Sequence, residues 1–228
     1  MCGRFANPLT AEELETRLHA KANALYARGW KPTWNAAPSQ HHPVLILSGG
    51  ERRLGLMRWG WKPAFLAGRD LVNARGEEAH GKRTFAEAFL RRRCLVPASA
   101  FYEWQEQPEG GANKPFAIAR VDREPFTIAG LWCWLDAPEG QEREPAFLLL
   151  TVPANATIAP VHHRQACIIA PADRDRWLDP TTPIAAVRAL VVACPDAELE
   201  AWPVSKAVNA PKNDGPELLA LAIQGQPR

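Results

Sequence analysis

Short apolar segments rich in β-branched and aromatic residues recur along the chain, and connections containing Pro or Gly separate them. Such segments favour the strands of a mostly antiparallel sheet. The regular alternation of strand and helix that is typical of a doubly wound fold does not occur in the sequence. The pattern therefore predicts an α+β fold with a curved or barrel-like sheet and peripheral helices. The predicted strands are 42–48, 54–61, 94–96, 101–105, 116–121, 126–134, 147–152 and 167–170.

Short helices are predicted around this sheet from two kinds of start signal. The first is a threonine followed three residues later by glutamate, which is the spacing of a capping box. The second is a proline, which favours the first turn of a helix. The predicted helices run from Thr10 to about Ala20 and from Thr84 to about Arg92, and others begin at Pro183 and Pro216.

The chain of 228 residues with 46% hydrophobic content is long enough to bury a full core without a metal or disulfide. It contains no internal repeat or low-complexity linker, so residues 1–228 are expected to form a single domain and a monomer. No stretch reaches the roughly 20 apolar residues that span a bilayer, and charged residues precede any apolar run at the N-terminus. These features predict a cytoplasmic protein with no membrane partner.

The net charge of +2 restricts any nucleic-acid contact to a local patch of the surface. Nine tryptophans are more informative, because tryptophan packs in cores and also stacks on unpaired bases.

The five cysteines are an odd number without CxxC pairs, which argues against a disulfide framework and a zinc site. Cys94, Cys133 and Cys167 lie in strand-like apolar runs, where cysteine acts as a small buried hydrophobe. Cys2 differs because it is next to the chain start in a polar setting.

Removal of Met1 would give Cys2 a free α-amine beside its thiol, which together form a 1,2-aminothiol. With an aldehyde, the amine forms an imine and the thiol closes a five-membered thiazolidine. The ordinary pKa values, about 8 for the amine and about 8.5 for the thiol, leave a nucleophilic fraction near neutral pH. The alternative reading is a cysteine that merely follows Met1.

Three other motifs contain polar side chains suited to proton transfer or positioning. Glu103 lies among aromatic residues, which favours a raised carboxyl pKa, although a strand glutamate facing solvent is equally compatible. His162 can shuttle protons or belong to a solvated turn after Pro160. Asn73 can orient a reactive group and Arg75 can reach a phosphate, or both can be ordinary surface residues. Arg91, Arg92 and Arg93 fit a helix end, where cations favour the dipole.

Taken in order, these motifs resemble the SRAP family, the SOS-response-associated peptidases now understood as abasic-site-processing proteins. The resemblance extends along nearly the whole chain. The matching blocks are Met1-Cys2-Gly3-Arg4-Phe5, Trp34-Asn35-Ala36-Ala37-Pro38-Ser39-Gln40, Arg58-Trp59-Gly60, Asn73-Ala74-Arg75, Arg92-Arg93-Cys94-Leu95-Val96-Pro97-Ala98, Phe101-Tyr102-Glu103-Trp104, His162-His163-Arg164, Pro203-Val204-Ser205, Val208-Asn209 and Asn213-Asp214-Gly215-Pro216-Glu217-Leu218.

The resemblance implies a DNA-damage protein that crosslinks covalently to abasic sites in single-stranded DNA and is consumed by the reaction. Replication or repair machinery would be its partners, and no cofactor is implied because the aldehyde supplies the electrophile. Whether Met1 leaves by self-processing or by an aminopeptidase stays open. The implied active-site residues are Cys2, Asn73, Glu103 and His162, and the implied DNA-binding residues are Arg4, Pro38, Trp59, Arg75, Trp104 and Thr151.

The sequence departs from the family pattern at three places. Gln165-Ala166 replaces a Met-Pro pair, Gly76 replaces a common Ser, and Trp61-Lys62 replaces a more aliphatic pair. These changes leave every implied reacting group in place and affect the wall of the pocket.

Three rival functions remain at this stage. A cysteine peptidase using Cys2 and His162 would need an oxyanion hole, and none can be identified from sequence. A non-covalent single-strand-binding module would not depend on Cys2. A reader of methyl-lysine or of modified bases would use the tryptophans and need no aldehyde.

Overall fold

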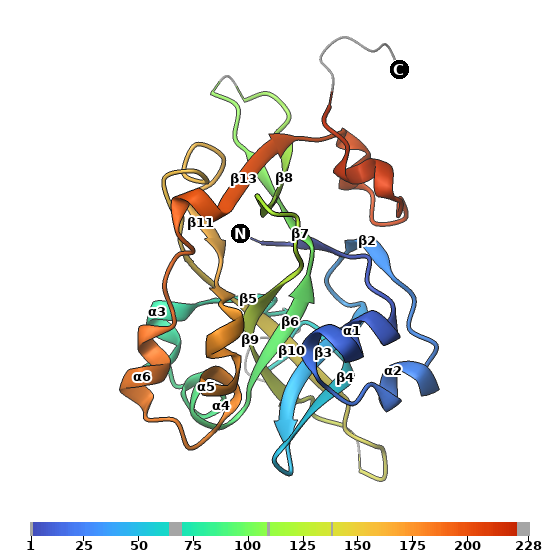
Figure 1. Cartoon of the computed structure of the whole chain (residues 1–228), viewed down its shortest axis with the longest axis vertical. Coiled ribbons are helices and arrows are strands. Elements are labelled where there is room, and N and C mark those ends of the chain that lie inside the picture. Colours follow the sequence, from blue (N-terminus) through green and yellow to red (C-terminus); the bar gives the residue numbers. More distant parts are fainter. Residues whose placement is uncertain (1, 64–69, 109, 138, 223–228) are drawn as a thin grey trace.

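The computed structural model describes residues 2–63, 70–108, 110–137 and 139–222, and its strands form two sheets (Figure 1). The strands are β1 (Arg4–Asn7), β2 (Thr33–Ala36), β3 (His41–Ser48), β4 (Glu51–Trp59), β5 (Asn73–Arg75), β6 (Arg93–Ala98), β7 (Ala100–Gln105), β8 (Lys114–Arg120), β9 (Phe126–Trp134), β10 (Pro145–Pro153), β11 (Arg164–Ala166), β12 (Ile168–Ile169) and β13 (Leu199–Pro203). The smaller sheet has the order β13-β8-β7-β1-β2. The larger has the order β11-β10-β4-β3-β6-β9-β12, with β5 beside β10.

The larger sheet closes on itself because β10 pairs with both β4 and β9. The pairings β4–β3, β3–β6 and β6–β9 complete the ring. Pairing is antiparallel except where β10 meets β4 and β5. The predicted α+β fold with a curved, barrel-like and mainly antiparallel sheet is therefore confirmed.

Short helices lie at the periphery of the sheets (Figure 1). They are α1 (Ala11–Leu18), α2 (Asn23–Ala27), α3 (Gly76–Ala79), α4 (Ala86–Arg91), α5 (Arg174–Leu178) and α6 (Ile184–Ala189), with 3-10 turns at Pro171–Asp173, Asp196–Glu198, Lys206–Asn209 and Pro216–Leu219. The predicted capping box of α1 is present: the Glu13 amide donates to Thr10 Oγ1 (3.2 Å), and the Thr10 amide donates to Glu13 Oε2 (2.7 Å). As predicted, α6 begins directly after Pro183. Among the described helices, none is long and apolar enough to cross a membrane.

Two of the predicted helix starts are wrong in detail. The helix expected from Thr84 begins at Ala86, and its N-cap position is held by Phe85 without a side-chain hydrogen bond. Phe85 instead packs its ring edge-on against Trp61, with 5.8 Å between ring centroids. The segment after Pro216 is a single 3-10 turn, because Leu218 is buried and the following residues extend to pair Leu221 with Val204.

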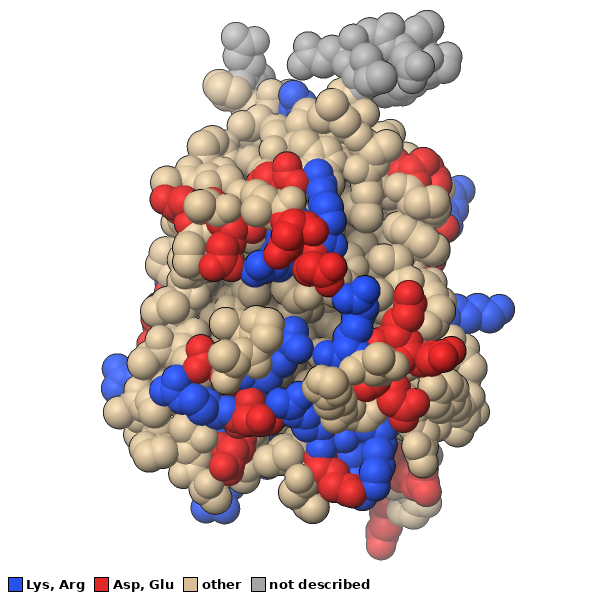
Figure 2. Space-filling model, viewed as in Figure 1, with Lys and Arg blue, Asp and Glu red and all other residues tan. Residues whose placement is uncertain are grey.

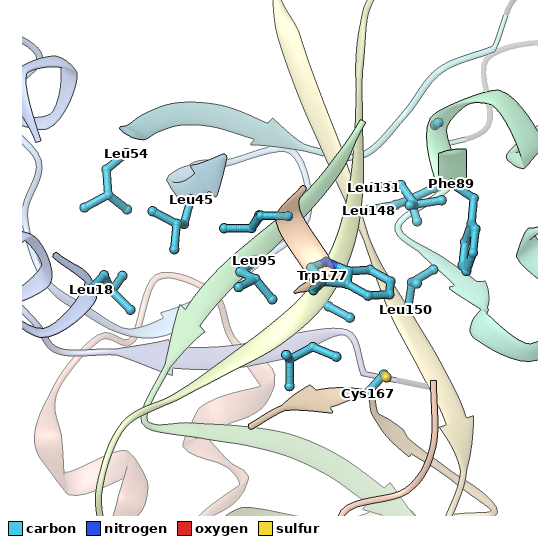
Figure 3. Packing of buried hydrophobic residues seen from close by; sticks show 14 of the residues in the cluster. Leu18, Leu45, Leu54, Phe89, Leu95, Leu131, Leu148, Leu150, Cys167 and Trp177 are labelled. Atoms are coloured by element: carbon cyan, nitrogen blue, oxygen red, sulfur yellow. The ribbon is translucent and has the colours of Figure 1, made fainter. Parts of the chain in front are cut away.

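The largest hydrophobic cluster packs the ring against α1, α2, α4, α5 and α6 (Figure 3). Leu45, Leu95 and Leu148 come from the ring strands, and Trp177 of α5 lies among them. The Trp177 indole donates to the Cys94 carbonyl (2.8 Å). The Arg93 guanidinium donates to the carbonyls of Phe89 and Leu90 near the end of α4, a favourable place for a cation.

A second cluster joins residues of both sheets and positions the candidate site. It contains Phe5 and Phe101 from the smaller sheet, Trp59 and Phe147 from the ring, and Cys2. A third cluster, which includes Tyr102 and Val208, covers the other face of the smaller sheet.

Candidate active site

Cys2 lies just before β1, at an end of the chain that runs beside β7 (Figure 1). The residue is completely buried, with the polar groups of Asn73 and Glu103 beside it. Its thiol contacts the Arg4 carbonyl, with 3.8 Å between Sγ and O. Burial, with a smaller contribution from the Glu103 carboxylate, raises the pKa of the Cys2 thiol well above its ordinary value. The thiol is therefore protonated at neutral pH, and the nucleophilic fraction inferred from ordinary pKa values is not available in this form of the chain.

Asn73 is the first residue of β5, which lies parallel to β10 with Asn73 paired to Leu149. Its amide Nδ2 donates to the Cys2 carbonyl at 2.8 Å. Among the described residues, the amide oxygen Oδ1 is buried without a hydrogen-bond partner. Asn73 thus holds the backbone of Cys2, while its Oδ1 can still accept a hydrogen bond. A buried acceptor without a donor lowers the stability of the fold.

Glu103 comes from β7, whose pairing of Tyr102 with Arg4 brings the next residue alongside the chain that precedes β1. Side chains alternate along β7: Phe101 belongs to the cluster that contains Cys2, whereas Tyr102 belongs to the cluster on the opposite face. Only 1% of Glu103 is exposed. Burial raises its pKa to about 7, the range in which a carboxyl group can both give and take protons at neutral pH.

His162 lies in the loop between β10 and β11, half-buried and stacked on His163. The Arg164 amide donates to His162 Nδ1 at 2.9 Å. Burial lowers the pKa of His162. A neutral ring that accepts at Nδ1 carries its proton on Nε2 and presents a donor there.

The loop that carries His162 is attached to the strand that carries Glu103. Gln105 of β7 donates through Nε2 to the Pro160 carbonyl (2.9 Å). On the other side, Thr151 of β10 pairs with both Arg75 of β5 and Ala166 of β11. The segments that carry Glu103 and His162 are therefore joined directly, and β10 connects the strand of Asn73 to β11, which follows His162.

The sequence motifs assigned no role to the ion pair between the buried Arg164 and the more exposed Glu77. The Arg164 guanidinium is almost fully buried, donates to Glu77 Oε2 at 2.9 Å, and also donates to the Thr151 carbonyl at 2.6 Å. All three residues of β11 are buried, Arg164 among them. The position of arginine two residues after His162 was the available signal.

The DNA-binding candidates occupy very different environments. Arg75 is exposed, and its contact with Glu78 is a weak surface pair at 3.2 Å. The Arg4 guanidinium is half-buried and already donates to Asn35 Oδ1 and the Val208 carbonyl. Pro38 and Trp104 are half-buried, and the Trp104 indole donates to Asn209 Oδ1 at 2.8 Å.

Trp59 and Thr151 are fully buried, so neither presents a surface to DNA. The Trp59 indole donates to the Val72 carbonyl (2.9 Å) and its ring stacks on Phe147. The Thr151 hydroxyl donates to the Ala74 carbonyl. The sequence motif around Trp59 therefore reflects packing between the two sheets, and a direct contact of Trp59 with DNA is not supported.

Two departures from the family pattern have local structural correlates. A Cβ atom on Gly76 would lie 2.4 Å from Val191 Cγ1, so the space for a larger residue is occupied by Val191. Gln165 is fully buried, and its Oε1 accepts a hydrogen bond from the Asn155 amide at 2.8 Å. Gln165 thereby holds the start of the loop that carries His162.

Cys2 is thus buried near the start of the chain, beside the Asn73 amide and the Glu103 carboxyl group of raised pKa. Residues 1–211 match the model of the family described as SOS response associated peptidase (SRAP), and the chain belongs to this family.

Several relatives match over nearly all of the chain. The abasic site processing protein YoqW of Bacillus subtilis (strain 168) is 31% identical over 225 residues, covering 96% of this chain and 99% of the relative. The abasic site processing protein YedK of Escherichia coli (strain K12) is 31% identical over 227 residues, with the same coverage of 96% and 99%. The abasic site processing protein HMCES of Gallus gallus is 27% identical, covering 100% of this chain and 80% of the relative.

Solved structures share the fold. A crystal structure of a protein from Bacteroides thetaiotaomicron superposes with a TM-score of 0.84 at 18% identity, covering 97% of this chain and 100% of that one. A protein from Bordetella bronchiseptica superposes with a TM-score of 0.74 at 25% identity, covering 90% of this chain and 100% of that one.

Proposed function

We propose that this protein processes abasic sites in single-stranded DNA by forming a covalent thiazolidine between Cys2 and the aldehyde of the sugar. The observation that carries the proposal is the gathering of the Asn73 amide and the Glu103 carboxyl group around Cys2. The family, and the naming of its relatives as abasic site processing proteins, supply the substrate class.

The reaction requires removal of Met1, which frees the α-amine of Cys2. The neutral amine attacks C1 of the ring-opened sugar to form a carbinolamine, and loss of water gives an imine. The Cys2 sulfur then adds to C1, its proton passes to a base, and nitrogen is protonated as the five-membered ring closes. The sum is one aldehyde and one aminothiol giving one thiazolidine and one water, so no cofactor takes part.

Glu103 would transfer the protons of this sequence. With a pKa of about 7, it is present in both forms at neutral pH. The acid form can donate to the departing hydroxyl of the carbinolamine, and the carboxylate can accept the thiol proton as sulfur adds to C1. The high pKa of the buried thiol fits this order, because sulfur would react only after the imine has formed.

Asn73 and His162 would position the reacting groups. The Asn73 amide holds the Cys2 carbonyl, and its vacant Oδ1 can accept a hydrogen bond from the freed amine. The Nε2 proton of His162 can donate to the ring oxygen and favour opening of the sugar. These hydrogen bonds orient the groups before reaction.

The DNA would be held mainly from the exposed side of the site. Arg75 is the exposed cation nearest Asn73 in sequence and can pair with a phosphate. Trp104 can stack on an unpaired base, which is worth about 1–3 kcal/mol. Arg4 and Pro38 would border the path of the DNA strand. Thr151 would not contact the DNA and would act only through its hydrogen bond with Arg164.

The test mixes purified protein with a single-stranded oligonucleotide that carries one abasic site. Denaturing electrophoresis and intact mass should reveal a product equal to the protein without Met1, plus the DNA, minus one water. Cys2→Ala and a form that retains Met1 should both give none. Unchanged product in Cys2→Ala would exclude the proposal, whereas peptide cleavage without product would favour the peptidase suggested by the family's name.

A further inference from the structure

A separate cavity of about 550 Å³ lies between α1, the β8–β9 connection, β12 and the segment around residues 189–198. None of the proposed active-site residues lines it. Cavities that bind small ligands usually measure about 300–1,000 Å³ and combine apolar walls with a few polar groups. The apolar lining includes Leu14, Leu18, Phe126, Ile168, Leu190 and Val192.

The charged groups of this cavity are paired with one exception. Arg17 pairs with Glu124 at 2.8 Å, and Arg120 pairs with both Asp122 and Glu198 at 2.7 Å. The remaining acid, Asp173, pairs with Arg176 outside the cavity at 2.7 Å.

The exception is Arg174, which is half-buried and has no ion pair among the described residues. Its Nε donates to Thr127 Oγ1 at 3.3 Å. Within the described chain, the two terminal nitrogens have no hydrogen-bond partner. Burial and the positive charge of Arg52 lower the pKa of Arg174, so the charged guanidinium would be stabilised by an anion.

Thr127 gives this guanidinium a fixed position. It is fully buried, and its hydroxyl also donates to the Ile169 carbonyl at 3.3 Å. A guanidinium fixed at Nε leaves its two terminal nitrogens for the two oxygens of a carboxylate, the geometry of a bidentate pair.

On the face drawn in Figure 2, Lys and Arg side chains lie next to Asp and Glu side chains and form no broad basic field. Such a surface does not favour a polyanion over a single small anion. A ligand that fits this cavity therefore has one anionic group and an apolar body.

We infer that this cavity binds a small amphipathic carboxylate, with its carboxylate on Arg174 and its hydrocarbon part against Leu14, Phe126 and Ile168. The site is independent of abasic-site chemistry and does not rest on the function proposed above.

The test titrates the whole protein with decanoate and with decanamide by isothermal calorimetry. The amide has the same chain without the charge. Decanoate should bind about tenfold more tightly than decanamide, because a charge-assisted pair replaces a neutral contact. Arg174→Gln should remove that difference. Arg91→Gln, at an exposed position that does not line the cavity, should preserve it.

Methyl spectra should locate the ligand at Ile168, Leu190 and Val192, and thermal unfolding should show that Arg174→Gln is folded. Absence of decanoate binding at about 1 mM would overturn the inference. It would also be overturned by equal affinity of decanoate for Arg174→Gln, or by shifts confined to other methyl groups. Crosslinking to an abasic oligonucleotide should proceed in Arg174→Gln, so failure of either proposal is recognised separately.

Discussion

The hydrophobic core of the ring and the Cys2 site both lie inside the protein, but the core is built from apolar side chains and the site contains polar ones. The core around Leu95 and Trp177 is packed from apolar side chains, and the Trp177 indole has a backbone partner. The Cys2 site collects the buried Cys2 thiol, Glu103 and Arg164 with the half-buried Asn73. Burial of the Glu103 carboxyl group reduces stability, and so does the buried Asn73 Oδ1, which has no hydrogen-bond partner among the described residues. The ring thus supplies stability, whereas the junction of the sheets carries the polar groups that the proposed reaction would use.

The largest effect is expected from the core. Leu95→Ala should lower the free energy of unfolding by about 3–4 kcal/mol through lost contacts and a cavity. Denaturant unfolding measures this change, and Val192→Ala, at an exposed position, serves as the control. Crosslinking at a temperature where the variant stays folded should be unchanged. A large loss of crosslinking there would show that core and site are not separable.

Glu103→Gln should raise the free energy of unfolding, whereas Leu95→Ala lowers it. Because the pKa of Glu103 is raised from 4.5 to about 7, the folded protein keeps a proton that the unfolded chain loses within that pH window. The free energy of unfolding therefore falls as pH rises from 4.5 to about 7. Glutamine avoids this loss and should stabilise the protein by about 3 kcal/mol at about pH 8.

The same substitution should slow crosslinking about 100-fold, because proton transfer is lost. It should also remove a limb of the pH–rate profile near pH 7. Single-turnover gels over a pH series measure the rate, with Glu106→Gln as an exposed control. A variant that is neither more stable nor slower would contradict the assignment of Glu103.

A smaller effect on stability is expected at the ion pair of Arg164 with Glu77. Arg164→Met should cost about 2 kcal/mol of stability, since it leaves Glu77 and the Thr151 carbonyl without their buried donor. A double-mutant cycle with Glu77→Gln isolates the pair. Additive effects of the two substitutions would show that the ion pair contributes nothing of its own.

The smallest effect is expected at the surface. Arg75→Gln should weaken binding of single-stranded DNA by less than about 1 kcal/mol and reduce the magnitude of the salt slope by about 0.7, the value for one phosphate contact. Fluorescence anisotropy across a salt series measures both quantities. Arg188→Gln, on the exposed face of α6, should leave the slope unchanged. An unaltered slope in Arg75→Gln would remove Arg75 from the DNA path.

Local patterns in the sequence predicted the parts of the structure that depend on neighbouring residues. The capping box at Thr10 is set by hydrogen bonds within a few residues. The raised pKa of Glu103 agrees with the interpretation in which its surroundings bury it, and not with the alternative of a strand glutamate facing solvent. That residues 1–228 form one domain stays a prediction.

Features set by distant contacts could not be predicted in this way. Closure of the ring depends on β10 pairing with both β4 and β9, which no local pattern specifies. Burial of Cys2 and Trp59 results from the packing of one sheet on the other. The 3-10 turn after Pro216 reflects the pairing of Leu221 with Val204. The ion pair of Arg164 with Glu77 joins residues that are far apart in the chain.

The most direct test of the account uses an abasic oligonucleotide labelled isotopically at C1 of the sugar. Carbon NMR of the purified crosslink distinguishes a saturated C1 bonded to sulfur and nitrogen from an unsaturated imine carbon. The account predicts a saturated C1 that persists in the native protein, and no labelled adduct with Cys2→Ala. A signal that remains an imine, or an adduct attached to a residue other than Cys2, would contradict it.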